Sequence, residues 1–366
     1  FSAGGRWMIE KVQIEVTTNC NLRCEYCLKP EIAIDIEEEI VEKISGIAKR
    51  YIFYGFGEPM LNKKLGKLLD LVDGETVIST NGMVDENFYE IAQLFDVVGV
   101  SIDTGDLRKG FVLEKAIKKL ENLESPFAQF VILEDNFREF LALASSFAEK
   151  GIKVLATNAI APNSAIYEKT LYFEGSRINF EHIHLTESEI MEMIREHFYI
   201  DPSRKAIAKK ALNLQAIIEA KERILKAGKA LEKVAEFFGS SEFIIPEFFG
   251  ESEKRTCPYR ESIFVRADGK VAVCMELAYE HEEFVNRRKK LVRDFIIGDL
   301  RWQEIEDILE KLKEFEKLRR NMDFPWCGDC AHVFGCWFLE NGMDCYGNER
   351  SCSECLYSVS IAKCLV

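Results

Sequence analysis

The sequence lacks several features that would place it in common protein classes. No run of apolar residues approaches the roughly 18 that a membrane-spanning helix needs, so we expect no membrane span. The opening residues lack the apolar stretch of a secretory signal, and we therefore expect a cytoplasmic protein. Acidic residues outnumber basic ones, giving a net charge of −14, which argues against nucleic acid as the main partner.

Histidine is also scarce, whereas cysteine is abundant. The chain has 5 His and 12 Cys, and so many thiols in an unsecreted chain favour metal ligation over a disulfide framework. A ligand set rich in thiolate and poor in imidazole favours iron–sulfur clusters or an all-Cys zinc site. Three cysteines lie near the start, none follows until Cys257, and nine lie between Cys257 and Cys364.

Hydrophobic patterning predicts an α/β arrangement in the first 160 residues. The predicted strands are 12–16, 51–54, 76–79, 97–102, 127–133 and 153–157. The predicted helices are 36–49, 61–72, 87–94, 108–123 and 137–150. Strands that alternate with helices imply a parallel sheet with right-handed crossovers. Their even spacing fits a partial barrel as well as a doubly wound sheet.

The pattern changes after residue 160. Residues 204–238 predict a long amphipathic helix, which could break at Gly228 and which we expect to pack against the preceding sheet. Residues 240–253 resemble a linker, 263–273 predict a hairpin, and 303–320 predict a helix. The Cys-rich tail has little periodicity, so we expect it to need metal to fold.

The N-terminal cysteines follow the first predicted strand. Cys20, Cys24 and Cys27 have the spacing C-x₃-C-x₂-C. Three thiolates on one loop suit three irons of a [4Fe–4S] cluster and leave the fourth iron open for chemistry. A zinc loop is the alternative, but zinc usually takes a fourth protein ligand and none lies nearby.

This motif, with Tyr26 before its last Cys, resembles that of the radical S-adenosylmethionine (SAM) superfamily. The turn Gly55-Phe56-Gly57-Glu58-Pro59 resembles the family's Gly-Gly-Glu-Pro turn, with Phe56 in place of the first expected Gly. Two later strand ends, 79–82 and 101–103, are also similar to those of the family.

The resemblance implies a fold, cofactors and a reaction. It implies a partial (β/α)6 TIM-like barrel, a [4Fe–4S] cluster with an open iron, and SAM, which a reductant such as ferredoxin or flavodoxin would help to cleave. The resulting 5′-deoxyadenosyl radical would abstract hydrogen from a protein, peptide or cofactor substrate. The SAM contacts that carry over are Gly57, Glu58, Thr80, Asn81, Ser101 and Asp103.

The late cysteines resemble the SPASM extension of radical SAM enzymes, which holds one or two auxiliary [4Fe–4S] clusters. The spacing departs from the family pattern at Cys345. One division gives Cys257, Cys274 and Cys345 to the first cluster, and Cys327, Cys330, Cys336 and Cys355 to the second. Cys352 is a further candidate, and nine thiols exceed eight ligands. A structural zinc ribbon built on Cys327-x₂-Cys330 and Cys352-x₂-Cys355 is the alternative.

With this resemblance we predict three regions. They are a radical SAM partial barrel at 8–185, a helical connecting segment and linker at 186–250, and a small Cys-rich iron–sulfur domain at 251–366. The tail, including Phe324-Pro325-Trp326-Cys327, resembles more specifically the radical SAM maturases of tungsten-cofactor oxidoreductases, also called tungstopterin cofactor-modifying proteins.

Three hypotheses remain open at this point. The first is a radical SAM maturase of a tungsten oxidoreductase, acting on its pterin cofactor or on a peptide of it. The second is a ribosomal-peptide modifier that forms thioether or C–C crosslinks. The third is a non-catalytic iron–sulfur or zinc protein. No general acid or base is assigned: Asp103, Glu134 and Asp135 lie near predicted strand ends, and His332 lies among the late cysteines.

Overall fold

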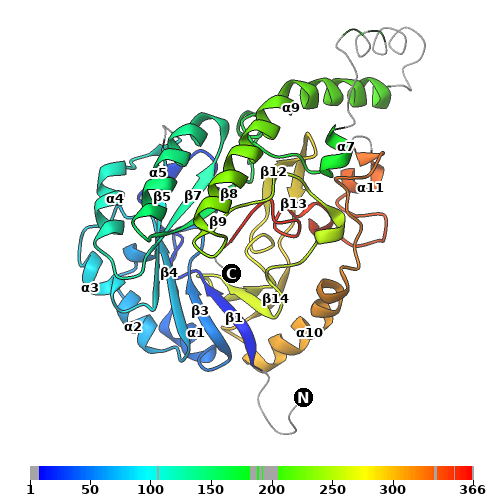
Figure 1. The fold of residues 1–366 in the computed structure, drawn as a ribbon. Coiled ribbons are helices and arrows are strands. Elements are labelled where there is room, and N and C mark those ends of the chain that lie inside the picture. The colour runs from blue at the N-terminus through cyan, green and yellow to red at the C-terminus, as the bar shows by residue number, and fades with distance from the viewer. Residues whose placement is uncertain are drawn as a thin grey trace.

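A parallel sheet forms the centre of the molecule. The computed structural model describes residues 8–104, 107–181, 188, 192, 205–333, 336–349 and 351–364. Six strands pair in parallel in the order of the chain (Figure 1). They are β1 (Ile9–Ile14), β3 (Ala48–Phe53), β4 (Glu75–Thr80), β5 (Val97–Ile102), β7 (Phe127–Ile132) and β8 (Lys153–Asn158). The six predicted β-units of an α/β fold are confirmed.

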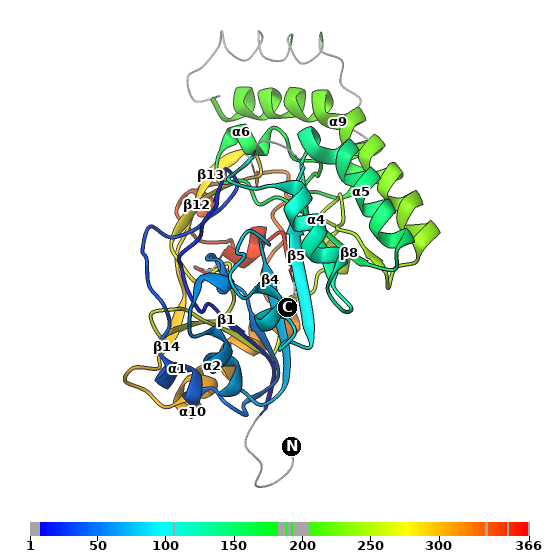
Figure 2. The same ribbon diagram turned by 90° about the vertical axis from the view of Figure 1, so that its left-hand side faces the viewer.

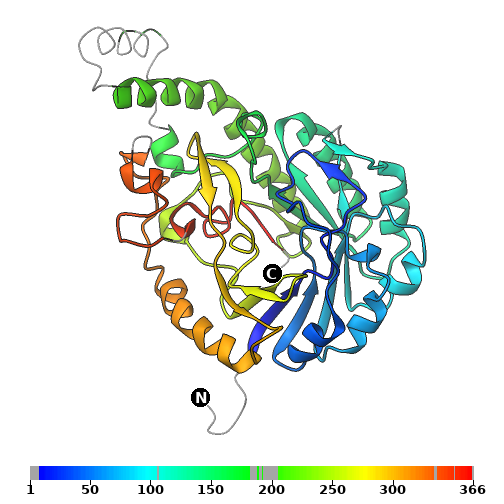
Figure 3. The same ribbon diagram turned by 180° about the vertical axis from the view of Figure 1, so that it is seen from behind.

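Later segments extend this sheet to ten strands. The strand β9 (Phe243–Ile244) pairs in parallel with β8 at one edge, and β10 (Ser262–Val265) pairs in parallel with β1 at the other. Beyond β10, the strands β11 (Lys270–Ala272) and β14 (Ile296–Asp299) add in antiparallel fashion. The predicted hairpin at 263–273 is therefore confirmed as β10–β11. The C-terminal region thus continues the N-terminal sheet, as the view from behind shows (Figure 3).

Helices between the parallel strands cover one face of the sheet (Figure 2). They are α1 (Glu38–Lys43), α2 (Leu65–Asp70), α3 (Phe88–Ala92), α4 (Leu113–Glu121) and α5 (Phe137–Glu149). The helix predicted at 36–49 ends early, because the chain turns at Gly46, with φ of +67°, before β3. The helix predicted at 108–123 starts late, because β6 (Arg108–Lys109) pairs with β2 (Arg23–Cys24).

The long helix α9 (Lys205–Phe238) is continuous through Gly228. It packs against α5 and buries Ile217, Ile224 and Leu231, which confirms the expected packing (Figure 2). The segment at 240–253, which we predicted as a linker, contributes β9 and buries Phe248 against the same core.

The remaining described helices and one further hairpin lie outside the ten-stranded sheet. They are α6 (Ser164–Tyr167), α7 (Arg177–Glu181), the hairpin of β12 (His281–Val285) and β13 (Arg288–Val292), α10 (Ile305–Asn321) and α11 (Trp337–Glu340). The tail buries Leu356 and Ile361 with Tyr172 and Trp326 in a small core of its own. None of the described helices is long and apolar enough to cross a membrane.

Candidate active site and iron–sulfur centres

A cavity of about 200 Å³ lies at the carboxyl ends of the parallel strands. Its wall takes one or more residues from each of the six central strands or from the loop that follows it. In parallel α/β folds this end of the sheet is where ligands bind, because the variable loops converge there. Cys20, Cys24 and Cys27 all line it, and so do Gly57, Glu58, Thr80, Asn81 and Ser101.

The cysteine loop is held in place by short contacts. The β2–β6 pairing links Cys24 to Arg108, whose Nε donates to the Cys24 sulfur at 3.3 Å. The Cys20 sulfur accepts from the Leu22 amide at 3.4 Å and from Asn81 Nδ2 at 3.8 Å. Burial raises the pKa of the Cys20 thiol, so a cationic partner is needed to keep the thiolate.

Glu58 connects the turn after β3 to the end of β4. Its buried carboxylate accepts hydrogen bonds from Thr80 Oγ1 and the Asn81 amide, both at 2.7 Å, and from the Met60 amide at 3.1 Å. Burial raises the pKa of Glu58, and the hydrogen bonds oppose that shift. A Cβ at Gly57 would come within 2.1 Å of the Thr17 carbonyl oxygen, so the turn requires glycine there.

Asp103 lies behind the cavity wall and is not among the described residues that line it. Its carboxylate accepts from Tyr26 Oη at 2.6 Å and from Asn136 Nδ2 at 3.3 Å, and Arg108 Nε lies 3.9 Å away. These contacts use both oxygens. Asp103 therefore positions the cysteine loop through Tyr26 and Arg108.

The other acidic candidates and His332 lie outside the cavity wall. Glu134 pairs with Arg223 at 2.6 Å, and Asp135 pairs with Lys169 at 2.5 Å. His332 is exposed. These contacts match solvated surface groups, and the structure gives none of the three a place at the cavity.

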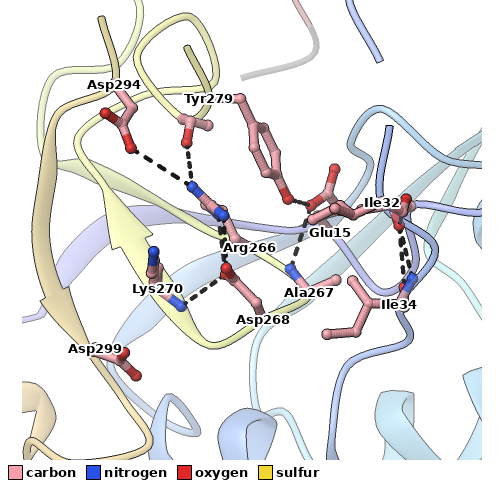
Figure 4. A network of polar contacts seen from close by, with 12 residues as sticks. Glu15, Ile32, Ile34, Arg266, Ala267, Asp268, Lys270, Tyr279, Asp294 and Asp299 are labelled. Carbon is pink, nitrogen blue, oxygen red and sulfur yellow. Dashed lines mark hydrogen bonds and ion pairs between the residues drawn. The ribbon is translucent and has the colours of Figure 1, made fainter. Parts of the chain in front are cut away.

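Glu15, which the sequence patterning did not single out, joins the two ends of the chain (Figure 4). The fully buried carboxylate accepts from Tyr279 Oη, from the Phe56 amide at 3.1 Å and from the Ala267 amide at 3.3 Å. The Phe56 ring also packs edge-on against Tyr279, with the ring centroids 5.6 Å apart. This packing explains why Phe is accommodated where the family turn has Gly.

The C-terminal cysteines form two groups. Cys274 interacts electrostatically with Cys257 and Cys352, and Cys355 interacts with all three. Cys352 lies in a single 3₁₀ turn, Ser351–Glu354, and Cys355 directly follows it, so the two cysteines are close together. This grouping differs from the predicted division, which placed Cys355 with the other set and Cys345 with this one.

The second group contains Cys327, which interacts electrostatically with Cys330 and Cys336. Cys345 is exposed and follows these residues in the chain. Burial raises the pKa values of Cys274, Cys327 and Cys355, so these thiols also need a metal to ionise at neutral pH.

Three further cavity residues were missed by sequence reasoning. Glu276, His281 and Cys364 line the cavity together with the N-terminal cysteines. Cys364 influences the ionisation of Tyr54, as do Cys24 and Cys27, so Tyr54 lies between the two ends of the chain. No local motif marks these residues, because they reach the cavity only through the tertiary fold.

Comparison with known proteins agrees with this geometry. Residues 14–162 match the radical SAM superfamily, and residues 257–332 match SPASM, an iron–sulfur cluster-binding domain. The chain is a radical SAM enzyme with a SPASM domain. Its matched N-terminal region contains the cysteine loop and the five central strands that follow β1, and the second matched region contains Cys257 to Cys330.

The enzyme has relatives of different lengths. It is 24% identical to the tungsten-containing aldehyde ferredoxin oxidoreductase cofactor-modifying protein of Pyrococcus furiosus, over 96% of both chains. It is 25% identical to a GTP 3′,8-cyclase of Staphylococcus epidermidis, over 53% of this chain and 64% of that protein. Among solved structures, Streptococcus suis SuiB bound to SAM covers 96% of this chain and 78% of its own, with a TM-score of 0.56 and 13% identity.

The residues present fit the cofactors of a radical SAM enzyme. Three thiols from one loop supply three ligands, and no described acidic or imidazole side chain of that loop supplies a fourth. Donors from Arg108 and Asn81 already point at two of the sulfurs, as they would toward thiolates bound to iron. The cavity next to them offers backbone and hydroxyl groups at the ends of β4 and β5.

Proposed function

We propose that this radical SAM enzyme is a maturase that acts on a tungsten-dependent oxidoreductase, on its pterin cofactor or on a peptide of it. The observation that carries the proposal is the full-length alignment with the Pyrococcus furiosus cofactor-modifying protein, which spans 96% of both chains. The cyclase relatives align over only part of the chain, as the one from Staphylococcus epidermidis does.

The proposed roles of the cavity residues follow from their positions. Cys20, Cys24 and Cys27 hold the [4Fe–4S] cluster, and Gly57, Glu58, Thr80, Asn81 and Ser101 surround SAM. When bound there, the cluster and SAM would supply the radical chemistry that removes a hydrogen atom from the substrate. Glu58 orients the Asn81 and Thr80 ends of β4, and Asp103 holds the cysteine loop through Tyr26.

The proposed auxiliary centres follow the two groups of thiols. Cys257, Cys274, Cys352 and Cys355 hold the first cluster, and Cys327, Cys330, Cys336 and Cys345 hold the second. Cys364 then remains outside both sets and faces the cavity. A reducing cytoplasm and a small electron donor such as ferredoxin or flavodoxin fit this set of oxidisable clusters.

A peptide-modifying enzyme is the second candidate. The favouring observation is the likeness to SuiB, which covers 96% of this chain at a TM-score of 0.56. SuiB itself has been solved with the precursor peptide SuiA. At 13% identity this likeness concerns the fold alone, so the full-length relative takes precedence.

The test is hydrogen transfer from candidate substrates to SAM. The reduced, reconstituted enzyme is incubated with SAM and one of three deuterium-labelled candidate substrates. These are the tungsten oxidoreductase apoprotein, its pterin cofactor, and short peptides encoded beside the enzyme. We expect deuterium in 5′-deoxyadenosine, by mass spectrometry, only with the oxidoreductase or its cofactor. Deuterium from the peptides alone would replace the first candidate with the second. A protein that holds its clusters but never cleaves SAM would instead be a non-catalytic iron–sulfur protein.

A further inference from the structure

Three buried side chains gather at the side of the cavity that the C-terminal region forms. Glu276 lies in the chain after β11, and His281 and Glu283 lie on β12 (Figure 1). Because His281 and Glu283 are two residues apart on a strand, their side chains point to the same face. One ligand atom from each of the three lies within 4.8 Å of the others. Their side chains are only 9%, 8% and 4% exposed, respectively.

The orientation of His281 leaves one ring nitrogen available. Nδ1 lies 2.9 Å from the Tyr279 carbonyl oxygen, to which it donates. Nε2 is buried and has no hydrogen-bond partner among the described residues, and the nearest Glu276 oxygen is 3.7 Å away. In metal-binding histidines, one ring nitrogen typically donates its proton to a backbone carbonyl. This fixes the tautomer, so that the other ring nitrogen has a free lone pair for the metal.

The local charge balance favours an added cation. Lys290 Nζ lies 3.1 Å from Glu283 and 3.5 Å from Glu354, and Arg288 pairs with Glu354 at 2.5 Å. Two permanent cations therefore face three carboxylates, Glu276 included.

Lys290 contacts both the cluster and the cysteine tail. Its Nζ lies 3.1 Å from Glu283 and 3.5 Å from Glu354, and Glu354 ends the 3₁₀ turn that contains Cys352. The lysine thus joins the cluster to the cysteine tail, while Glu276 and His281 face the cavity. An ion bound beside them would have protein ligands on one side and space for water or substrate on the other.

We propose that Glu276, His281 and Glu283 bind one divalent first-row metal ion, such as Mn²⁺, Fe²⁺ or Zn²⁺, at the cavity wall. Two carboxylates and one imidazole are a ligand set that suits such ions, whereas Mg²⁺ and Ca²⁺ prefer all-oxygen sites. The open side of the ion faces the cavity. There it would coordinate an oxygen of the substrate, such as a carboxylate or carbonyl group, opposite the N-terminal cysteines.

The probe for this site is Mn²⁺, because it is a hard ion that binds the thiols of the tail poorly. The full chain, reconstituted with iron and sulfide under argon and passed over a chelating resin, is titrated with Mn²⁺. The six-line electron paramagnetic resonance signal of free Mn²⁺ disappears on binding and so counts bound ions. Iron content and cluster absorbance, measured on every sample, show whether each variant has folded.

Two variants and one matched control sharpen the test. Glu283→Gln and His281→Gln each remove one ligand with little change of volume. Glu282→Gln lies on the same strand, but its side chain is 54% exposed and pairs with Lys289 on the outside. We expect one Mn²⁺ per chain for the original protein and for Glu282→Gln, and binding at least tenfold weaker in both ligand variants.

Two results would overturn the proposal. One is no Mn²⁺ binding by the original protein at millimolar Mn²⁺, which would leave the three groups as a proton-sharing cluster. The other is unchanged binding by both ligand variants, which would move the ion elsewhere. Because the titration needs neither SAM nor reductant, its outcome is independent of the proposed radical reaction.

Discussion

The two walls of the cavity are built in different ways. The wall at the ends of β1, β3, β4 and β5 consists of short, contiguous motifs, each placed directly after a strand. The opposite wall comes from residues far apart in sequence, including Met275, His281 and Cys364. The first wall is encoded locally, and the second exists only because β10 pairs with β1 and Tyr279 reaches Glu15. Substitutions in the two walls should therefore differ in their effects on SAM cleavage, iron content and stability.

The largest effect should come from the first wall. Replacing Cys24 by Ala removes one of only three thiols on the loop and leaves the Arg108 and Asp103 pair without its sulfur partner. We expect SAM cleavage to fall more than about 100-fold and iron content to fall by about four per chain. Both are measured on anaerobically reconstituted protein. Arg23→Lys, on the same loop with an exposed side chain, is the control and should retain both.

Glu58 should have the next largest effect. Glu58→Ala leaves the Thr80 hydroxyl and the Asn81 and Met60 amides without their acceptor. At about 1–3 kcal/mol for a buried donor left unpaired, we expect unfolding free energy to fall by about 3–5 kcal/mol. Glu58→Gln keeps one acceptor oxygen, so its unfolding free energy should fall by less than that of Glu58→Ala. Denaturant unfolding of both variants checks this, and equal stability of the two would contradict the account.

The pH dependence of stability should report on the second wall. The pKa of His281 is raised from 6.5 to about 9 in the folded protein. Its proton therefore stabilises the fold fully below about pH 6.5, and that contribution is lost as pH rises through 9. The loss corresponds to about 2–4 kcal/mol, and Glu276, Glu283 and Lys290 are the charged groups that face the ring.

The measurement is urea unfolding of chelator-treated protein between pH 6 and 10. His281→Gln should flatten the decline between pH 6.5 and 9. His332→Gln replaces an exposed histidine and should leave the curve as it is. An identical decline in His281→Gln would assign the pH dependence to other groups.

The last prediction concerns how the late cysteines divide between the two auxiliary clusters. Cys355→Ser should remove about four irons and leave the second group intact, because Cys355 interacts with Cys257, Cys274 and Cys352. Spectroscopy of the remaining clusters distinguishes this result from loss of the Cys327 group. Loss of the Cys327 group's cluster would restore the division expected from the spacing alone.

The sequence predicted what local patterns determine. Six strands and the position of the cysteine loop followed from periodicity and spacing, and the turn at Glu58 followed from the resemblance to the radical SAM family. Each of these features depends on residues close together in the chain. Strand β1 shows a feature that local patterning does not predict, the burial of its polar residues. The alternation of Gln13 and Glu15 with apolar residues predicts one solvated face, yet both residues are fully buried. The covering residues, Met275 and Tyr279, lie more than 250 positions away.

The same reason explains what was missed in the tail. The spacing of the late cysteines gave no way to pair Cys352 and Cys355 with Cys257, because a 3₁₀ turn and the fold of the tail decide that neighbourhood. The aromatic side chains within residues 240–253 pack into the same core as α9, whose contact with α5 is also tertiary. The predicted three-region division remains a prediction, since β10 joins the N-terminal sheet.

The central claim is that this cavity carries out radical SAM chemistry beside a cluster held by Cys20, Cys24 and Cys27. The most direct test measures iron, zinc and 5′-deoxyadenosine together on the reduced, reconstituted full chain supplied with SAM. For protein passed over a chelating resin, the account predicts about twelve irons per chain, no zinc and formation of 5′-deoxyadenosine with methionine. A protein that carries this iron but releases no 5′-deoxyadenosine, or that holds zinc and no iron, would contradict it.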